Sequence, residues 1–303
     1  MKKLWKMRVL ALFLCLAMLF SGLLPGQTAE AASGTDVRKA IDICYDYYYR
    51  TLWKNGSSVP DWTDGSELII AGMKESGYKA SAAFYTAYWQ KLKKSMKTVD
   101  PAAVDVLDWA KLVIVIHALG HKPSEIKTVN ILKQMCRKTA VKKSGQQMKY
   151  ALILQALDCG NYQVPSGSAY LTRAALIKKL SSDIMKFSSE SKMIDYPVMY
   201  AQPLARYYKT NAAAKKAVKK ALSLIRKNRN SSGGIGSPDN VWSEAQALIL
   251  LGAMGIHPET SQAYLVHGHS ITDAVLKYFN LKAGTTEITF DPAQVARGLN
   301  AGL

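Results

Sequence analysis

The chain has 303 residues and a formal net charge of +18, because 40 lysines and arginines outnumber 22 aspartates and glutamates. After residue 31 no stretch stays apolar for the roughly 18 residues that a membrane-spanning helix needs. The only cysteines after residue 31 are Cys44, Cys136 and Cys159, without paired spacing. This excludes a disulfide framework and predicts buried free thiols in one large domain with a substantial core.

The first 31 residues have the three parts of a secretory signal peptide. Residues 1–8 are basic, residues 9–24 are apolar, and Ala29-Glu30-Ala31 is a small-residue cleavage motif. We therefore expect a secreted or cell-surface domain of residues 32–303, with an uncleaved N-terminal anchor as the alternative. Removing the four basic residues and the one acidic residue of this segment lowers the net charge from +18 to +15.

A secreted chain with this charge is suited to anionic polymers of the cell envelope, such as wall teichoic acid, lipid headgroups or acidic polysaccharide. Export argues against nucleic acid as a partner, and simple solubility in an acidic envelope is the alternative. Residues 212–230 have a basic amphipathic pattern. This pattern fits a helix that lies on an anionic surface, or an outer helix with a solvated lysine face.

In chain order, an aromatic residue opens six apolar helical segments at steps of 41–48 residues. These residues are Trp62, Trp109, Tyr150, Tyr196, Trp242 and Phe290. A glycine follows ten or eleven positions later in four of the six segments. The spacing predicts a tandem repeat in which each unit contributes one apolar helix.

Amphipathic, lysine-rich segments lie between the apolar ones. They carry apolar residues at helical spacing, as Phe84, Tyr88, Leu92 and Met96 do. We expect amphipathic helices over residues 36–53, 80–97, 125–139, 169–187, 211–229 and 270–281. Residues 284–290 are the one candidate for a short strand.

Apolar helices need cover on all sides, whereas amphipathic helices need it on one face. About six helical hairpins closed into a ring, with the apolar helices inside, satisfy both requirements. The sequence therefore predicts an all-α fold of the α/α-toroid type over residues 32–303, and an open solenoid is the alternative. The last repeat is incomplete. Either the first and last helices pair across the closure, or the chain is a fragment of a longer protein.

Residues 231–260, SSGGIGSPDNVWSEAQALILLGAMGIHPET, show the repeat most clearly. A glycine-rich turn leads into a helix that begins near Trp242 and ends at Gly255 and Pro258. This segment resembles the prenyltransferase and squalene-cyclase repeat. The resemblance implies the α/α toroid of terpenoid cyclases, protein prenyltransferase β-subunits, complement thioester domains and cobalamin carriers. Because that group contains enzymes and binding proteins alike, it does not decide the function.

The motifs that the enzymes of this group need are missing from the sequence. No Asp-x-Asp-Asp acid motif occurs. Cys44-Tyr45 resembles the Cys-Tyr pair of the protein prenyltransferases but lies in the first helix. His267 and His269 have too few neighbouring ligands for zinc, and Cys159 does not begin a thioester motif. We expect no catalytic residue and no metal site, and the sequence leaves the identity of any cofactor unknown.

If the helices close into a ring, the starts of the inner helices gather at one mouth with aromatic and acidic side chains. Such a rim binds ring-shaped groups, whether of a sugar, a corrin or a peptide. The candidate ligand-binding residues are Asp61, Trp62, Asp108, Trp109, Tyr150, Asp195, Tyr196, Asp239, Trp242 and Glu244. The alternative for the carboxylates is helix capping, and for the aromatic residues it is packing between helices.

The sequence therefore predicts an exported module that binds a small-molecule, lipid or glycan ligand at this mouth and performs no chemistry. The alternative is an enzyme that acts on an isoprenoid lipid or an anionic polysaccharide, as a cyclase, transferase, lyase or hydrolase. A structural or adhesive module without a cavity is the third interpretation.

Overall fold

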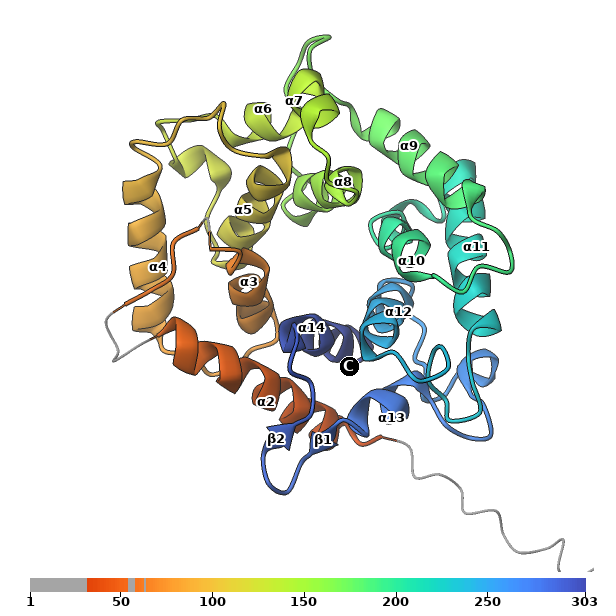
Figure 1. Cartoon of the computed structure of the whole chain (residues 1–303). Coiled ribbons are helices and arrows are strands. Elements are labelled where there is room, and N and C mark those ends of the chain that lie inside the picture. The colour runs from red at the N-terminus through yellow and green to blue at the C-terminus, as the bar shows by residue number, and fades with distance from the viewer. Residues whose placement is uncertain (1–31, 54–57, 63) are drawn as a thin grey trace, which may run out of the picture. The chain divides into compact units, whose positions relative to one another are not determined.

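Helices account for nearly all regular structure in residues 32–53, 58–62 and 64–303, which the computed structural model of the chain describes (Figure 1). These residues form thirteen α-helices, three 3-10 helices and one two-stranded sheet. The predicted all-α class is thus confirmed. Residues 32–303 form one unit, and the predicted signal peptide lies outside the described residues. None of the described helices combines the length and apolar composition needed to cross a membrane.

Six helices form an inner set within this unit. Each contacts the next in chain order, and the last contacts the first. Figure 1 shows them around a common centre. They are α3 (Glu67–Glu75), α5 (Val106–Ala118), α8 (Lys149–Cys159), α10 (Asp195–Ala201), α12 (Val241–Ala253) and α14 (Pro292–Gly302).

The remaining α-helices lie outside this set (Figure 1). They are α2 (Gly34–Leu52), α4 (Ala82–Ser95), α6 (Ile131–Cys136), α7 (Lys138–Lys143), α9 (Arg173–Lys186), α11 (Ala212–Lys227) and α13 (Ile271–Leu276). The 3-10 helices are η1 (Pro123–Glu125), η2 (Ala205–Tyr207) and η3 (Gln262–Tyr264). The apolar core fills the space between the two sets, since the buried side chains come from both.

Side-chain caps fix where many of these helices begin. Ser81 accepts a hydrogen bond from the backbone N–H of Phe84 at the start of α4, and Asn240 accepts two at the start of α12. Asp105 caps α5 by accepting from the N–H of Leu107 at 2.8 Å. A capping oxygen satisfies backbone donors that the helix itself leaves free. The capping residue of α5 is therefore Asp105 and not the candidate Asp108, which lies in the first turn of that helix.

The predicted amphipathic helix over residues 125–139 is wrong. This region contains η1, an extended link, α6 and then α7. Arg137 has an extended backbone between α6 and α7 and forms a bridge with Tyr170. The N–H of Lys138 donates to the carbonyl of Ala169, and the N–H of Leu171 donates to that of Cys136. A distant segment therefore takes backbone groups that a continuous helix would have used.

Two further predicted boundaries need correction. Trp62 does not open a helix, because the N–H of Asp64 donates to the carbonyl of Asp61 and α3 begins only at Glu67. Helix α13 ends at Leu276 rather than near residue 281, since the chain then enters β1 (Phe279–Asn280). This strand pairs antiparallel with β2 (Thr285–Thr286), with Phe279 opposite Thr286. The predicted strand over 284–290 is therefore a two-residue strand.

Helices α12 and α14 approach each other closely at two glycines. Gly298 lies so near α12 that an added Cβ would be 2.7 Å from Cα and 2.8 Å from the carbonyl oxygen of Ala245. Gly252 of α12 likewise faces the backbone of Ala301. Helix α14 also packs on α2, so the first and last described helices are in contact. These glycines allow α14 to pack between α12 and α2.

We predict that Gly298→Val destabilises the protein by about 1–3 kcal/mol, because the new side chain must push α14 away from the backbone of α12. Urea unfolding followed by circular dichroism measures this loss. Gly145→Ala is the matched control, since an added Cβ there meets nothing within 4 Å. Equal stability of the two variants would contradict the close packing described above.

Candidate functional site

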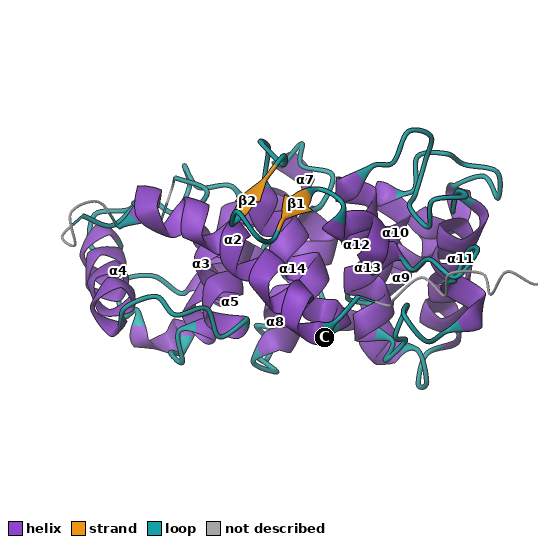
Figure 2. Ribbon diagram, turned by 90° about the horizontal axis from the view of Figure 1, so that it is seen from below, coloured by secondary structure: helices purple, strands orange, loops and turns teal. Residues whose placement is uncertain are grey.

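The starts of α10, α12 and α14 lie together on one face of the unit, which we call the start face. The hydroxyl of Ser243 in α12 donates a 2.6 Å hydrogen bond to Asp195 of α10. The indole N–H of Trp242 donates to the carbonyl of Phe290, just before α14, and the two rings lie 6.0 Å apart. Figure 2 shows the β1–β2 hairpin that leads into α14 on this face and the C-terminal end on the opposite one.

Trp62 and Trp109 join the starts of α3 and α5 in the same way. Their rings stack with centroids 5.7 Å apart. Only 4% of Trp62 and 1% of Trp109 is exposed. Both indoles are therefore covered by protein in this conformation, and their contacts are those of helix packing.

Three predicted ligand-binding carboxylates have partners within the protein. Asp61 accepts a 2.9 Å hydrogen bond from the backbone N–H of the next residue. Asp108 forms a 3.1 Å ion pair with Lys111. Asp239 accepts from the hydroxyl of Ser232 at 2.8 Å. To bind a ligand, these carboxylates would have to break the hydrogen bonds or the ion pair that they already form within the protein.

Among the candidate aromatic residues of the ligand-binding mouth, Tyr196 is exposed and Tyr150 and Trp242 are half-buried. Tyr196 is 37% exposed and lies beside Tyr200, with ring centroids 6.2 Å apart. Tyr150 is half-buried, and the ammonium groups of Lys149 and Lys179 lie 5.6 and 5.3 Å from its ring centre. An aromatic ring flanked by cations remains a candidate for contact with an anionic ring-bearing ligand.

The structure has a cavity of about 250 Å³ between the inner helices, and none of the ten predicted residues lines it. Five inner helices contribute to its wall, and α2 contributes Tyr45. The wall combines apolar side chains with five side-chain amides, one carboxylate and one guanidinium. The sequence signal for such a wall is a single polar residue within an otherwise apolar helix. Gln155 is an example, because it lies in the apolar segment 149–159.

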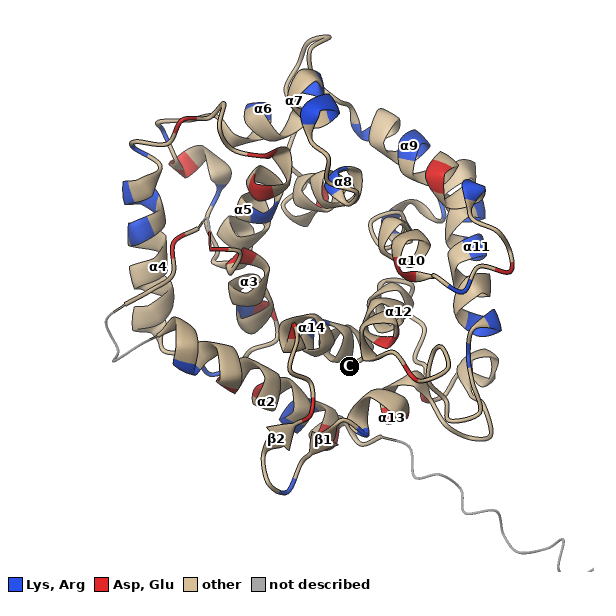
Figure 3. Cartoon of the chain, viewed as in Figure 1, with Lys and Arg blue, Asp and Glu red and all other residues tan. Residues whose placement is uncertain are grey.

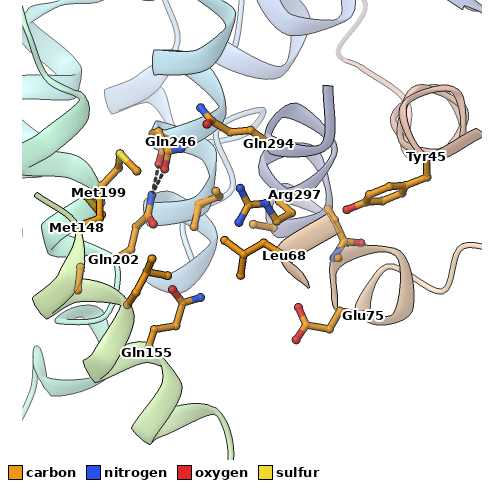
Figure 4. Close-up of a pocket in the computed structure, with 16 residues that line it drawn as sticks. Tyr45, Leu68, Glu75, Met148, Gln155, Met199, Gln202, Gln246, Gln294 and Arg297 are labelled. Carbon is orange, nitrogen blue, oxygen red and sulfur yellow. Dashed lines mark hydrogen bonds between the residues drawn. The ribbon is translucent and has the colours of Figure 1, made fainter. Parts of the chain in front are cut away.

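The amides of the cavity wall fall into two groups. Gln202 of the α10 end donates to the side-chain oxygen of Gln246 at 2.7 Å and to its backbone carbonyl at 3.1 Å (Figure 4). Gln294 donates to the carbonyl of Trp242 at 3.3 Å, which ties the wall to the start face. Gln155 and Asn300 have no hydrogen-bond partner among the described residues. Their amides are therefore free to bind a ligand.

Glu75 is the only carboxylate in this wall. Burial raises its pKa above the ordinary value, and His117 and Arg297 act in the opposite direction. Glu75 is the last residue of α3, where it lines the cavity and is also exposed to solvent. It is placed to interact with a donor or a cation that enters the cavity.

Glu244, a predicted ligand-binding residue, is fully buried and supports the glycine-rich turn. Its Oε1 accepts a 3.0 Å hydrogen bond from the N–H of Ile235, and its Oε2 has no partner among the described residues. An added Cβ on Gly234 would collide with this carboxyl group. Burial, together with a smaller effect of nearby Asp239, raises the pKa of Glu244 to about 7. The glycine turn thus packs directly against a buried acid.

The described cysteine and histidine residues do not assemble a metal centre. No three Cys, His, Asp or Glu side chains converge as ligands in residues 32–53, 58–62 and 64–303. Cys44 and Cys136 are buried free thiols, as predicted, and Cys159 is a half-buried one. Burial raises the pKa of each to about 12, which keeps the thiols protonated and unreactive. In comparisons with known proteins, no family model and no curated protein matches the chain.

The buried acid at residue 244 gives a testable dependence of stability on pH. The unfolded chain ionises Glu244 near pH 4.5, whereas the folded chain keeps it protonated up to about 7. Folding therefore takes up a proton between these values, and the free energy of unfolding falls as the pH rises through them. Glu244→Gln should flatten this fall and be more stable than the wild type at about pH 8, by on the order of 2 kcal/mol.

Urea unfolding at several pH values between about 4.5 and 8 measures this difference. Exposed Glu287→Gln is the matched control and should follow the wild-type curve. A Glu244→Gln variant whose stability falls with pH as steeply as that of the wild type would show that this acid is not the group responsible.

Proposed function

We propose that residues 32–303 form an exported α/α toroid that binds a small ligand in the cavity between its inner helices and performs no chemistry. The resemblance of residues 231–260 to the prenyltransferase and squalene-cyclase repeat supports the toroid, as do the successive contacts of the inner helices. Export rests on the signal-peptide pattern of residues 1–31. The observation that carries the binding role is the cavity wall itself, with polar groups that lack protein partners among apolar side chains.

The composition of the wall favours binding over the alternative enzyme activities. A glycosidase uses two carboxyl groups across a cleft, and the cavity offers only Glu75. The amides and methionines around it fix and surround a ligand, but they do not transfer protons readily. Ligand recognition needs no more than these groups. The aromatic residues of the start face, Tyr196 and Trp242, would then contact a ligand as it enters.

We predict that Ile249→Trp, which projects an indole into the cavity, abolishes retention of small molecules by the purified protein. Native mass spectrometry compares the mass of the folded protein with that of the denatured chain. Ala213→Trp adds the same side chain to the exposed face of α11 and should keep the wild-type cargo. Identical cargo on Ile249→Trp and the wild type would locate binding elsewhere and overturn the proposed cavity role.

A separate partner is suggested by the outer helices. Figure 3 shows lysine and arginine residues concentrated on the outward side of α4, α7, α9 and α11. Lys215, Lys216 and Lys219 of α11 are exposed, and no ion pair of the described residues involves them. A surface of this kind attracts anionic cell-envelope polymers through long-range, salt-sensitive forces.

We expect replacement of Lys215, Lys216 and Lys219 by glutamine to weaken binding to immobilised lipoteichoic acid several-fold at low salt. The control replaces three exposed lysines of other segments, Lys39, Lys74 and Lys282, by glutamine, so that the net charge changes equally. If both triple variants lose the same affinity, the attraction follows net charge alone and α11 is no specific surface.

A further inference from the structure

Arg297 of α14 is the only cation in the cavity wall. Its Nε is buried without a hydrogen bond, and none of the ion pairs of the described residues involves it. A guanidinium presents donors in a fixed planar fork that fits the two oxygens of a carboxylate. Arg297 therefore offers unpaired guanidinium donors to a cavity whose other polar groups are amides, the phenol of Tyr45 and the carboxylate of Glu75.

Tyr45 supplies a second free donor at the same place. The residue is fully buried, lines the cavity from α2, and has no hydrogen-bond partner for its hydroxyl. Gly72 makes room for it, because an added Cβ on Gly72 would collide with the Tyr45 hydroxyl and lie 3.1 Å from Cγ of Arg297. Burial raises the pKa of Tyr45, so the hydroxyl keeps its proton. A buried donor without an acceptor is costly, and a ligand acceptor would remove that cost.

Glu75 faces these two donors without neutralising them. It lies close enough to Arg297 for their charges to influence each other, yet no ion pair within 4.0 Å joins them among the described residues. Figure 4 shows Glu75, Arg297 and Tyr45 on one side of the cavity, with Gln202 and Gln246 on the other. A carboxylate and a guanidinium that lie near each other without pairing can bind a ligand that carries both an ammonium and a carboxylate.

We infer that the cavity binds a small zwitterion, a free α-amino acid or a dipeptide, with its carboxylate on Arg297 and Tyr45 and its ammonium on Glu75. This inference rests on the proposed function and names the class of its ligand. The free amides of Gln155 and Asn300 would bind polar atoms of the ligand. Met148, Met199 and Leu152 would surround an apolar side chain, since thioether side chains adapt to varied shapes.

The test measures binding of defined probes to the purified protein by isothermal titration calorimetry. The zwitterionic probes are L-alanine, L-leucine, L-methionine and L-alanyl-L-alanine. Comparison of the dipeptide with the three amino acids shows which of the two ligand types the cavity binds. The matched probes are propionate, which lacks the ammonium, and the amide of L-leucine, which lacks the carboxylate. We expect at least one zwitterion to bind roughly tenfold or more tightly than both matched probes, because each charged hydrogen bond adds about that factor.

Two variants assign the charges. Arg297→Gln should weaken binding of the zwitterion and of propionate about tenfold or more, whereas Glu75→Gln should weaken only the zwitterion. Tyr45→Phe should weaken both by a smaller factor. Arg50→Gln, on the exposed side of α2, is the matched control and should bind as the wild type does. Circular dichroism establishes that each variant is folded before titration.

The outcomes separate this inference from the function on which it rests. If propionate binds as tightly as the amino acids and Glu75→Gln has no effect, the inference that the ligand is a zwitterion is overturned. If no probe binds but the wild type retains a neutral cargo that Ile249→Trp loses, the ligand class is wrong and the cavity role stands. If no probe binds and no cargo depends on residue 249, both proposals fall.

Discussion

The contact between α12 and α14 is the constraint on which the described arrangement depends. Helix α14 contacts α12, α2 and α3, so it joins the latest part of the chain to the earliest. Residues without large side chains make this possible, because Gly298 meets the backbone at Ala245 and Gly252 meets it at Ala301. Close backbone approach of this kind requires glycine at the crossing point. The cavity follows from the same contact, since α14 carries Gln294 and Arg297 into it.

The two sets of helices divide the charge of the protein between an outer and an inner environment. The outer helices carry most of the lysines that make the chain basic (Figure 3). The cavity has one carboxylate and one guanidinium, and its remaining polar groups are neutral amides and a phenol. An ionised group in such a site loses water, so it is stable there only with a partner or with solvent that a ligand can replace. In the proposed function, net charge accounts for attraction at the outer surface, and geometry accounts for selection in the cavity.

The sequence predicted the helical class and most helix positions, because apolar spacing and capping residues are local signals. The expected helices over 36–53, 80–97, 169–187 and 211–229 each correspond to one observed helix within a few residues. The helix predicted over 125–139 was wrong because residues 169–171 hydrogen-bond with its backbone. That competition joins segments thirty residues apart, and periodicity within a short window carries no information about it.

The candidate site was harder to predict, because a repeat identifies equivalent positions but not the direction in which each side chain points. The opening aromatic residues share a role in the repeat, yet Trp62 and Trp109 pack inside while Tyr196 stays open. The cavity wall comes instead from single polar residues in the middle of apolar helices, such as Gln246 in α12. In an apolar helix a lone amide costs free energy unless a partner or a cavity accepts it. Such residues are therefore a better guide to the interior of a helical repeat than the residues that recur in every unit.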